Sequence, residues 1–570
     1  MKRRRFLGMG VAGAAGAGLA GRGYRSDANP AAPPGSDLQA RLVRANDARI
    51  PERLDRQEMG ASHPWLGAVR DEHGIHSAGG TAGLVPALVA ALASPGSRFH
   101  GSPEIGARLA LAARALLALQ HADGTVDLHT TNFHSPPDTA FALEPVCASL
   151  SVIRRAWPAV PAQAASDLER FARKAGDALV VGGIHTPNHR WVVCAALARL
   201  YALFPDPRSV ARVDEWLAEG IDIDADGQFS ERSTSVYSPV SDRSLLTVAR
   251  LLGREALLEP VRRNLEMTLH YLHADGDVAT EASRRQDQYR RASPAGYHLP
   301  YRELALRDGN GRFAAAARLI EAKEGDSLAG DLIHFLEEPS LGRDLPPSAA
   351  LPSDFARPFP GSDLVRIRRG RVSATLLGGN SCLLSFHKGG ATLEAVRLAS
   401  AFFGKGQFVG ERLEVEGDRY VLRQLLAGPY YQPLPPELRR ADGTWDPADR
   451  ARRPQSEVQR LDTRLVVREL SGAFEIEVEA AGTNRVPLAI ELGFRRGGEL
   501  AGVVPLEGRE DAFLLPEGTG EYRLDGETIR FGPGRAGHTW TELRGALPKL
   551  DALSVYLTGF TPFRATLRIA

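Results

Sequence analysis

Two short polar segments hold the side chains of this chain that are best suited to chemistry. They are residues 186–191 and residues 226–237, roughly forty positions further along. The first contains an amide and an imidazole, Asn188 and His189, and the second ends in a phenol, Tyr237. An amide and an imidazole can bind an anion, and a phenol can transfer a proton. The pattern predicts a site that binds a carboxylate and moves a proton, provided that the fold brings both segments together.

The first segment has the sequence of a helix start. Thr186 is a favourable N-cap residue, and Pro187 suits the first helical position, where its missing N–H costs nothing. Asn188 and His189 then fall in the first turn, where unpaired backbone donors and the helix dipole favour an anion by about 0.3–1 kcal/mol. The alternative is that Asn188 only helps to cap the helix and that His189 is a partly exposed surface residue.

The second segment predicts a polar loop. Asp226 and Gly227 form a turn, and the residues that follow are too polar for an interior helix. Glu231 is a candidate substrate-binding residue in this loop. Arg232 is a candidate catalytic residue, because its positive charge can stabilise negative charge that develops during a reaction.

These segments must be positioned by a helical region that we expect to span residues 37–345. Apolar residues recur there at three- and four-residue spacing, and Gly-, Pro- and Asp-rich connections separate the periodic runs. Ala-rich helices joined in antiparallel pairs suit a layered ring whose inner helices are buried on most sides. We therefore predict an incomplete α/α toroid, although no strict sequence repeat is visible. The expected helices are residues 105–120, 138–157, 162–179, 188–204, 212–218, 241–252, 261–273 and 313–324.

From residue 346 to residue 570 the pattern changes to short runs of alternating polarity. Residues 474–480 alternate without exception, as do residues 565–569, which predicts antiparallel strands with one solvent-exposed face. Further strands are expected at residues 371–377, 382–387, 464–469, 488–494 and 552–558. The predicted fold class is therefore α+β and multidomain, with the helical toroid followed by an antiparallel β-sandwich.

The two segments and the domain order together resemble the heparinase II/III-like polysaccharide lyases. In that family a helical toroid carries an Asn-His pair, followed by an acidic turn with glycine, a Glu-x-Ser element and a tyrosine. The resemblance implies that Asn188 and His189 lie at the substrate carboxylate and that Tyr237 donates or accepts a proton. The family pattern usually has histidine directly after the tyrosine. Here that position is Ser238, which leaves the second proton-transfer group unassigned.

The implied reaction is β-elimination, and the residues present suit it. Removing the C5 proton of a uronic acid places negative charge next to its carboxylate, and hydrogen bonds and positive charge stabilise that charge. Asn188, His189 and Arg232 fit this role. A base and an acid must act near C5 and O4, and the phenol of Tyr237 beside an arginine fits one of these roles.

Other polar clusters could complete the site. Asn132 and His134 lie in a loop ahead of a helix, where a toroid would hold substrate, and both are candidate substrate-binding residues. His387 ends a predicted strand and could reach the substrate from the second domain. Residues 281–287, which follow a Gly-containing turn, are a similar polar run that we interpret as a solvated loop.

No cofactor and no metal are expected. The spacing Asp222-x-Asp224-x-Asp226 imitates the start of a calcium-binding loop, but Ser233 stands where that loop needs a bidentate glutamate. No Cys/His spacing resembles a zinc site, although scattered histidines in the second domain leave a zinc site there open. No phosphate loop or dinucleotide fingerprint is present.

Two alternative functions remain open at this stage. A glycoside hydrolase on the same scaffold would need two carboxyl groups about 5–10 Å apart. Its candidates are Asp138, Glu144, Asp226 and Glu231. A noncatalytic carbohydrate-binding protein is the other alternative, because a fold does not by itself establish an activity.

The first 30 residues predict an export signal and linker. Residues 2–7 carry consecutive arginines and precede a weakly hydrophobic run, as in a twin-arginine signal, and that run is shorter than the ~20 residues of a membrane span. We expect a periplasmic or secreted protein that does not contact the membrane once the signal is removed. The formal net charge of +1 argues against nucleic acid as a partner. The expected partner is an acidic polysaccharide or oligosaccharide, and the oligomeric state is open.

Overall fold

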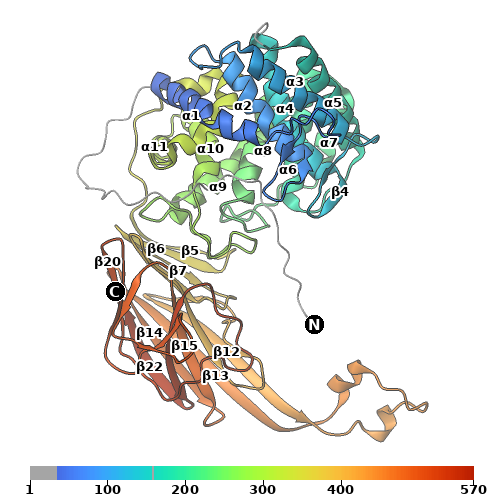
Figure 1. Cartoon of the computed structure of the whole chain (residues 1–570). Helices are drawn as coiled ribbons and strands as arrows, with labels where there is room; N and C mark the ends of the chain where they lie inside the picture. Colours follow the sequence, from blue (N-terminus) through green and yellow to red (C-terminus); the bar gives the residue numbers. More distant parts are fainter. Residues whose placement is uncertain (1–34, 157–159) are drawn as a thin grey trace. The chain divides into compact units, whose positions relative to one another are not determined.

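The computed structural model describes residues 35–156 and 160–570 (Figure 1). The predicted export signal therefore lies outside the described residues. The described chain forms two compact units. The first takes in the described residues up to Leu351 except His270–Asp277, and the second comprises His270–Asp277 with Pro352–Ala570. A helix-rich part followed by a strand-rich part confirms the predicted α+β class.

The first unit is built mainly from helices that alternate between two positions. Helices α2, α4, α6 and α8 pack against one another in succession, and α3, α5 and α7 cover them. The inner helix α6 is buried along nearly its whole length, whereas α7 buries only two residues. The helices are α1 (Gly35–Asp55), α2 (Ala78–Ala93), α3 (Pro103–Leu119), α4 (Pro136–Ala156), α5 (Ala162–Val181), α6 (Pro187–Leu203), α7 (Pro207–Ala218), α8 (Tyr237–Leu252), α9 (Leu258–Tyr271), α10 (His298–Asp308), α11 (Gly311–Glu324) and α12 (Leu332–Glu337).

Helical periodicity located most of these helices but missed α2. This helix is rich in Ala and Gly and is buried on most of its surface, so it lacks the polar face that produces a three- and four-residue pattern. Helices α1 and α10 were also absent from the expected set. In the part of the chain that the structure describes, no helix is long and apolar enough to cross a membrane.

The same tight turn recurs four times in the structure. In each case the N–H of the first residue bonds the carbonyl of the fifth, and the N–H of the fourth bonds the carbonyl of the first. The fourth residue is always glycine, with φ between 78° and 94°, a conformation that other residues rarely adopt. The turns are Asp71–Ile75, His121–Thr125, Asp224–Gln228 and His273–Asp277. The first three precede α2, α4 and α8, so they place similar loops at the starts of inner helices.

Two short two-stranded sheets belong to these connections. Strands β1 (Val69–Arg70) and β2 (His76–Ser77) flank the first turn. Strands β3 (Val126–Leu128) and β4 (Asn132–Ser135) follow the second turn and lead directly into α4. The loops at the inner-helix starts are therefore braced by backbone pairing, which suits them to hold side chains in fixed positions.

The second unit contains two large sheets, antiparallel except for one pair of strands. One sheet has the order β17-β18-β21-β15-β9-β8-β7-β6-β5, with β10 beside β9, and the other has the order β11-β12-β13-β14-β22-β20-β19-β16. The strands are β5 (Asp354–Phe359), β6 (Leu364–Arg369), β7 (Val372–Leu377), β8 (Leu384–Lys388), β9 (Ala391–Ser400), β10 (Gly406–Gln407), β11 (Glu414–Glu416), β12 (Arg419–Tyr431), β13 (Gln455–Leu470), β14 (Ala473–Gly482), β15 (Pro487–Phe494), β16 (Glu499–Ala501), β17 (Val504–Pro505), β18 (Ala512–Leu514), β19 (Gly520–Leu524), β20 (Glu527–Gly532), β21 (Leu553–Phe560) and β22 (Phe563–Ile569).

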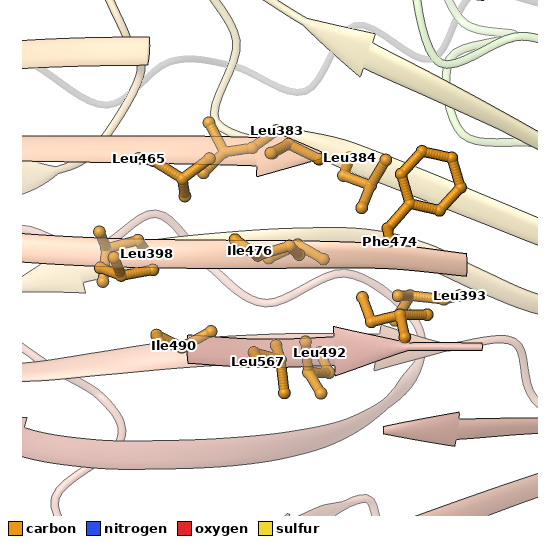
Figure 2. Packing of buried hydrophobic residues seen from close by; sticks show 14 of the residues in the cluster. Leu383, Leu384, Leu393, Leu398, Leu465, Phe474, Ile476, Ile490, Leu492 and Leu567 are labelled. Atoms are coloured by element: carbon orange, nitrogen blue, oxygen red, sulfur yellow. The ribbon is translucent and has the colours of Figure 1, made fainter. Parts of the chain in front are cut away.

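Both sheets contribute to one hydrophobic core. Leu393 and Leu492 from the first sheet pack in the same cluster as Phe474, Ile476 and Leu567 from the second (Figure 2). The side chains of β14 alternate between buried and more exposed along residues 474–480, which confirms the predicted period of two. The same alternation holds in β22.

Candidate active site

The start of α6 binds a carboxylate from a distant loop of the same unit. The backbone N–H of Asn188 donates to Glu231 Oε2 at 3.0 Å, and the Asn188 side-chain amide donates to the same oxygen. Thr186 is the N-cap residue, but its side chain makes no capping bond and instead accepts from Asn188 Nδ2 at 3.1 Å. The anion expected at this helix start is thus supplied by Glu231, in keeping with the positive end of the helix dipole.

This arrangement leaves two buried oxygens without a hydrogen-bond partner in the described structure. They are Asn188 Oδ1 and Glu231 Oε1. Glu231 Oε1 lies 4.0 Å from the guanidinium of Arg285, whose side chain is 38% exposed. A buried carboxylate oxygen that faces an accessible cation is a position where a ligand can complete the hydrogen bonding.

His189 is an uncharged imidazole at neutral pH. Burial lowers the pKa of His189 to about 4; nearby Asp138 opposes this shift, and His185 and Arg285 add to it. The ring nitrogen Nδ1 is buried and has no hydrogen-bond partner among the described residues. His189 can therefore donate or accept a hydrogen bond at a ligand, but it contributes no positive charge there.

Tyr237 is the first residue of α8, and a second loop holds its phenol. Gln286 Nε2 donates to the phenol oxygen at 2.9 Å. The guanidinium carbon of Arg285 lies 5.2 Å from the centre of the Tyr237 ring, within cation–π range. The backbone N–H of Tyr237 donates to Ser233 Oγ at 3.2 Å, which fixes the start of the helix. The phenol proton remains available for transfer.

Arg285 is the residue that joins these parts. It lies near Glu231, which binds Asn188, it acts electrostatically on His189, and it contacts the ring of Tyr237. The structure therefore brings both sequence segments to one place.

A set of hydrogen bonds locks the two loops together. Arg284 N–H donates to the carbonyl of Arg232 at 2.7 Å, and Arg232 adopts a positive φ of 49°. Asp287 accepts hydrogen bonds from the backbone and the hydroxyl of Ser235. These bonds hold Arg232 beside the second loop. Its predicted role in catalysis stays a prediction, as do the roles assigned to Asn188, His189, Tyr237 and Glu231.

Residues 281–287 form a loop, as predicted, and Arg284 and Arg285 are exposed, but other residues of the run are buried. We interpreted this run as a solvated loop, but Glu281 and Asp287 are 3% and 4% exposed. Arg285 and Gln286 from the same run face Tyr237. No local pattern marks these residues, because their partners lie about fifty positions earlier in the chain.

Asn132 and His134 lie on β4 but in different surroundings. Asn132 Nδ2 donates to Asp138 Oδ2 at 3.0 Å, and Asp138 is the carboxylate that acts on His189. His134 bonds Asp123 at 2.7 Å and stacks on His121, with ring centres 3.8 Å apart. Asn132 thus belongs to the surroundings of His189, whereas the contacts of His134 are with the preceding turn.

His387 belongs to the second unit. Its ring stacks on His273 of the same unit at 3.8 Å, and it lies 3.4 Å from Thr392 Oγ1. Its role as a substrate-binding residue stays a prediction.

The calcium-like spacing at Asp222–Asp226 serves a structural purpose. Asp224 Oδ1 accepts the N–H groups of Asp226 and Gln228 and closes the turn. Asp222 accepts from Trp191 Nε1 at 2.8 Å and ties the loop to α6. The carboxylates that would start a calcium loop are thus engaged in holding the Glu231 loop against the helix.

Glu144 also has a structural role. It lines a cavity of about 40 Å³ together with Arg199, Arg243 and Glu337. Arg199 bonds Glu144 at 2.9 Å and also pairs with Glu337, and both carboxylates have a lowered pKa, although burial alone would raise it. This cluster is a buried ion-pair network.

All three cysteines are buried and free of disulfide bonds. Burial raises the pKa of the Cys194 thiol to about 12, so it stays protonated. Cys147 and Cys194 are small residues of the helical core.

Comparison with known proteins gives the fold. No family model matches the sequence, and no curated protein matches it. Heparinase III is similar in structure, with 10% identity, 96% of this chain and 87% of that chain covered, and a TM-score of 0.56. The chondroitin AC lyase of Streptomyces coelicolor A3, in complex with chondroitin sulphate, is also similar in structure, at 14% identity and a TM-score of 0.53. The match covers 95% of this chain and 80% of that chain. A Paenibacillus xanthan lyase is similar at 10% identity and a TM-score of 0.56, and the match covers 94% of this chain and 57% of that chain.

The chain has the fold of these polysaccharide lyases. This confirms, at the level of fold, the resemblance that the two motifs indicated. At such low identity the likeness does not extend to individual residues, so the chemistry of the site has to be argued from its own geometry.

Proposed function

We propose that the protein is an exported lyase that cleaves a uronic-acid-containing glycan by β-elimination, on an incomplete α/α toroid followed by a β-sandwich. The observation that carries this proposal is the placement of Arg285 beside Glu231 and Tyr237, at a distance from which its charge also acts on His189. A cation, a neutral imidazole and a phenol around one point are the groups that this elimination needs.

The substrate carboxylate binds at Arg285 and His189. Arg285 supplies positive charge, and the neutral imidazole supplies a hydrogen bond. When the C5 proton leaves, the charge that spreads onto the carboxyl oxygens is stabilised in place by these groups, which need no rearrangement.

Glu231 positions the groups that bind this carboxylate. Its oxygen Oε2 accepts from Asn188, and its oxygen Oε1 is buried and lies 4.0 Å from the guanidinium of Arg285. Asn188 therefore holds Glu231 in place, and Glu231 in turn orients Arg285 at the point where the substrate binds.

Tyr237 moves a proton at the reacting sugar. Its oxygen accepts a hydrogen bond from Gln286, and its ring lies within cation–π range of Arg285, so both contacts hold the phenol in place. In its phenolate form Tyr237 can take the C5 proton, and in its phenol form it can protonate the leaving oxygen at O4. Bond formation and cleavage balance, because the C5–H electron pair forms the new double bond while the C4–O bond breaks.

Hydrolysis by a carboxylate pair is less well supported. Two of the four candidate carboxylates are engaged in the folded structure, because Glu144 pairs with Arg199 and Asp138 accepts a hydrogen bond from Asn132. A hydrolase needs one carboxyl free to protonate the leaving group and another to activate water or attack.

A panel of uronic-acid polymers tests the function. Elimination produces an unsaturated sugar that absorbs ultraviolet light together with a new reducing end, hydrolysis produces the reducing end alone, and binding produces neither. We expect both signals from at least one acidic glycan. Reducing ends without absorbance would refute the proposal.

A further inference from the structure

A second cluster of chemically active side chains lies at the start of the helical unit. The connection between α1 and β1 folds back on itself: Glu58 N–H donates to the carbonyl of Ala68, and Gly67 N–H donates to the carbonyl of Glu58, both at 2.8 Å. Gln57 pins this loop further through Nε2 bonds to the carbonyls of Gly67 and Arg108. The backbone of Glu58 is therefore fixed from both sides.

Three potential metal ligands converge on this loop. Glu58, His63 and His76 each offer one ligand atom, and these atoms lie within 4.8 Å of one another. Glu58 Oε2 and His76 Nε2 are 3.3 Å apart, and their side chains are 17% and 12% exposed. The other Glu58 oxygen accepts the N–H of Gly60 at 2.8 Å, which orients the carboxylate.

We propose that Glu58, His63 and His76 form a binding site for a divalent transition metal of the zinc class. Zinc binds histidine nitrogen and carboxylate oxygen at about 2.0–2.2 Å, so ligand atoms around a tetrahedral ion lie roughly 3.3–3.5 Å apart. The measured Glu58–His76 separation already fits this spacing. His63 reaches it by a small movement of its side chain, and the partial exposure of all three residues leaves a fourth position for water.

Binding needs a proton shift on one ring. His63 Nδ1 accepts a hydrogen bond of 3.1 Å from the backbone N–H of Trp65. If Nε2 is the ligand, the ring proton moves to Nδ1 and this long bond is given up. The ligand set then consists of two neutral imidazoles and one carboxylate, and the ion keeps a net charge of +1.

The metal would add a side-chain link between two segments that backbone bonds already join through β1, where Arg70 bonds Arg56 and pairs with His76. Glu58 and His63 belong to the folded-back loop, whereas His76 lies on β2, after the first of the recurring turns. An ion that binds the folded state and not the unfolded chain raises the free energy of unfolding by RT ln(1 + c/Kd), where c is the free ion concentration. The predicted consequence is a zinc-dependent melting temperature.

The test uses the full chain without an affinity tag, stripped of metal and titrated with Zn²⁺ by calorimetry. Co²⁺ is added separately, because its visible spectrum reports the number and kind of ligands. The variants are Glu58→Gln and His76→Gln. His73→Gln is the matched control, because His73 is an exposed histidine on the same hairpin, next to Glu72 and outside the cluster.

We expect wild type and His73→Gln to bind one zinc ion more per chain than either cluster variant, and to show a Co²⁺ spectrum that the variants lack. We also expect zinc to raise the melting temperature of wild type more than that of the variants. Circular dichroism of the metal-free proteins checks folding, and His63→Gln replaces any variant that fails to fold. Equal stoichiometry in wild type and the cluster variants would overturn the proposal. No glycan is involved, so this outcome is independent of the lyase assay.

Discussion

Replacing Tyr237 by phenylalanine removes one atom from the proposed reaction site. The phenol oxygen makes a single described side-chain bond, to Gln286 at 2.9 Å. The net contribution of such a bond to stability is about 0.5–1.5 kcal/mol, and water can replace the phenol oxygen at a half-buried position. The ring keeps its contact with Arg285, so the folded structure should survive nearly unchanged.

The effect on turnover should be much larger. A positioned acid or base accelerates a reaction by about 10²–10⁴-fold. At 1.36 kcal/mol for each factor of ten, its loss raises the barrier by roughly 2.7–5.4 kcal/mol. If Tyr237 had only a structural role, its replacement would lower the free energy of unfolding slightly and would not raise the activation barrier by this much.

The assay measures the unsaturated product on the best glycan of the panel, together with the unfolding free energy in denaturant. Tyr201→Phe is the matched control, because Tyr201 lies on α6 thirteen residues after Asn188, about 20 Å along the helix. We expect kcat to fall at least about a hundredfold in Tyr237→Phe and to stay within about twofold in Tyr201→Phe. A Tyr237→Phe enzyme with wild-type kcat would remove the phenol from the mechanism.

Three further predictions follow from the same contacts. Glu231→Gln keeps the acceptor for Asn188, so kcat/KM should fall less than about tenfold, whereas Glu231→Ala should lose about 10²–10³-fold. The reverse order would contradict the proposed positioning role of Glu231. Because burial lowers the pKa of His189 to about 4, kcat/KM should decline as the pH falls through 4 and not near 6.5. The free energy of unfolding should also decrease as the pH falls from 6.5 towards 4, because the unfolded chain binds the proton at a higher pH than the folded chain. Arg199→Met leaves Glu144 and Glu337 without their buried partner and should cost about 3–5 kcal/mol in urea unfolding, and a loss below 1 kcal/mol would contradict the ion-pair network.

The sequence could reveal those site residues whose local pattern carries information. Asn188 and His189 follow a proline that marks a helix start, and Glu231 and Tyr237 follow a glycine turn. Each of these signals lies within a few residues of the side chain concerned, so it can be recognised without knowing the fold.

Arg285 and Gln286 could not be found in this way. Their importance comes from contacts with Tyr237 and Glu231, about fifty residues away, and their own neighbourhood is an ordinary polar run. The helices and strands were likewise easier to predict where one face of the element is exposed to solvent, because the sequence then shows a local pattern of polar and apolar residues. The strand alternation in β14 was visible, whereas α2, buried on most of its surface, was not.

Glu231 lies between the start of α6 and Arg285. Its oxygen Oε2 accepts from Asn188, and its oxygen Oε1 lies 4.0 Å from the guanidinium of Arg285. Glutamine at this position keeps an acceptor for Asn188 and removes the negative charge beside Arg285, whereas alanine removes both the acceptor and the charge. The contrast between Glu231→Gln and Glu231→Ala therefore separates the charge of this residue from its position.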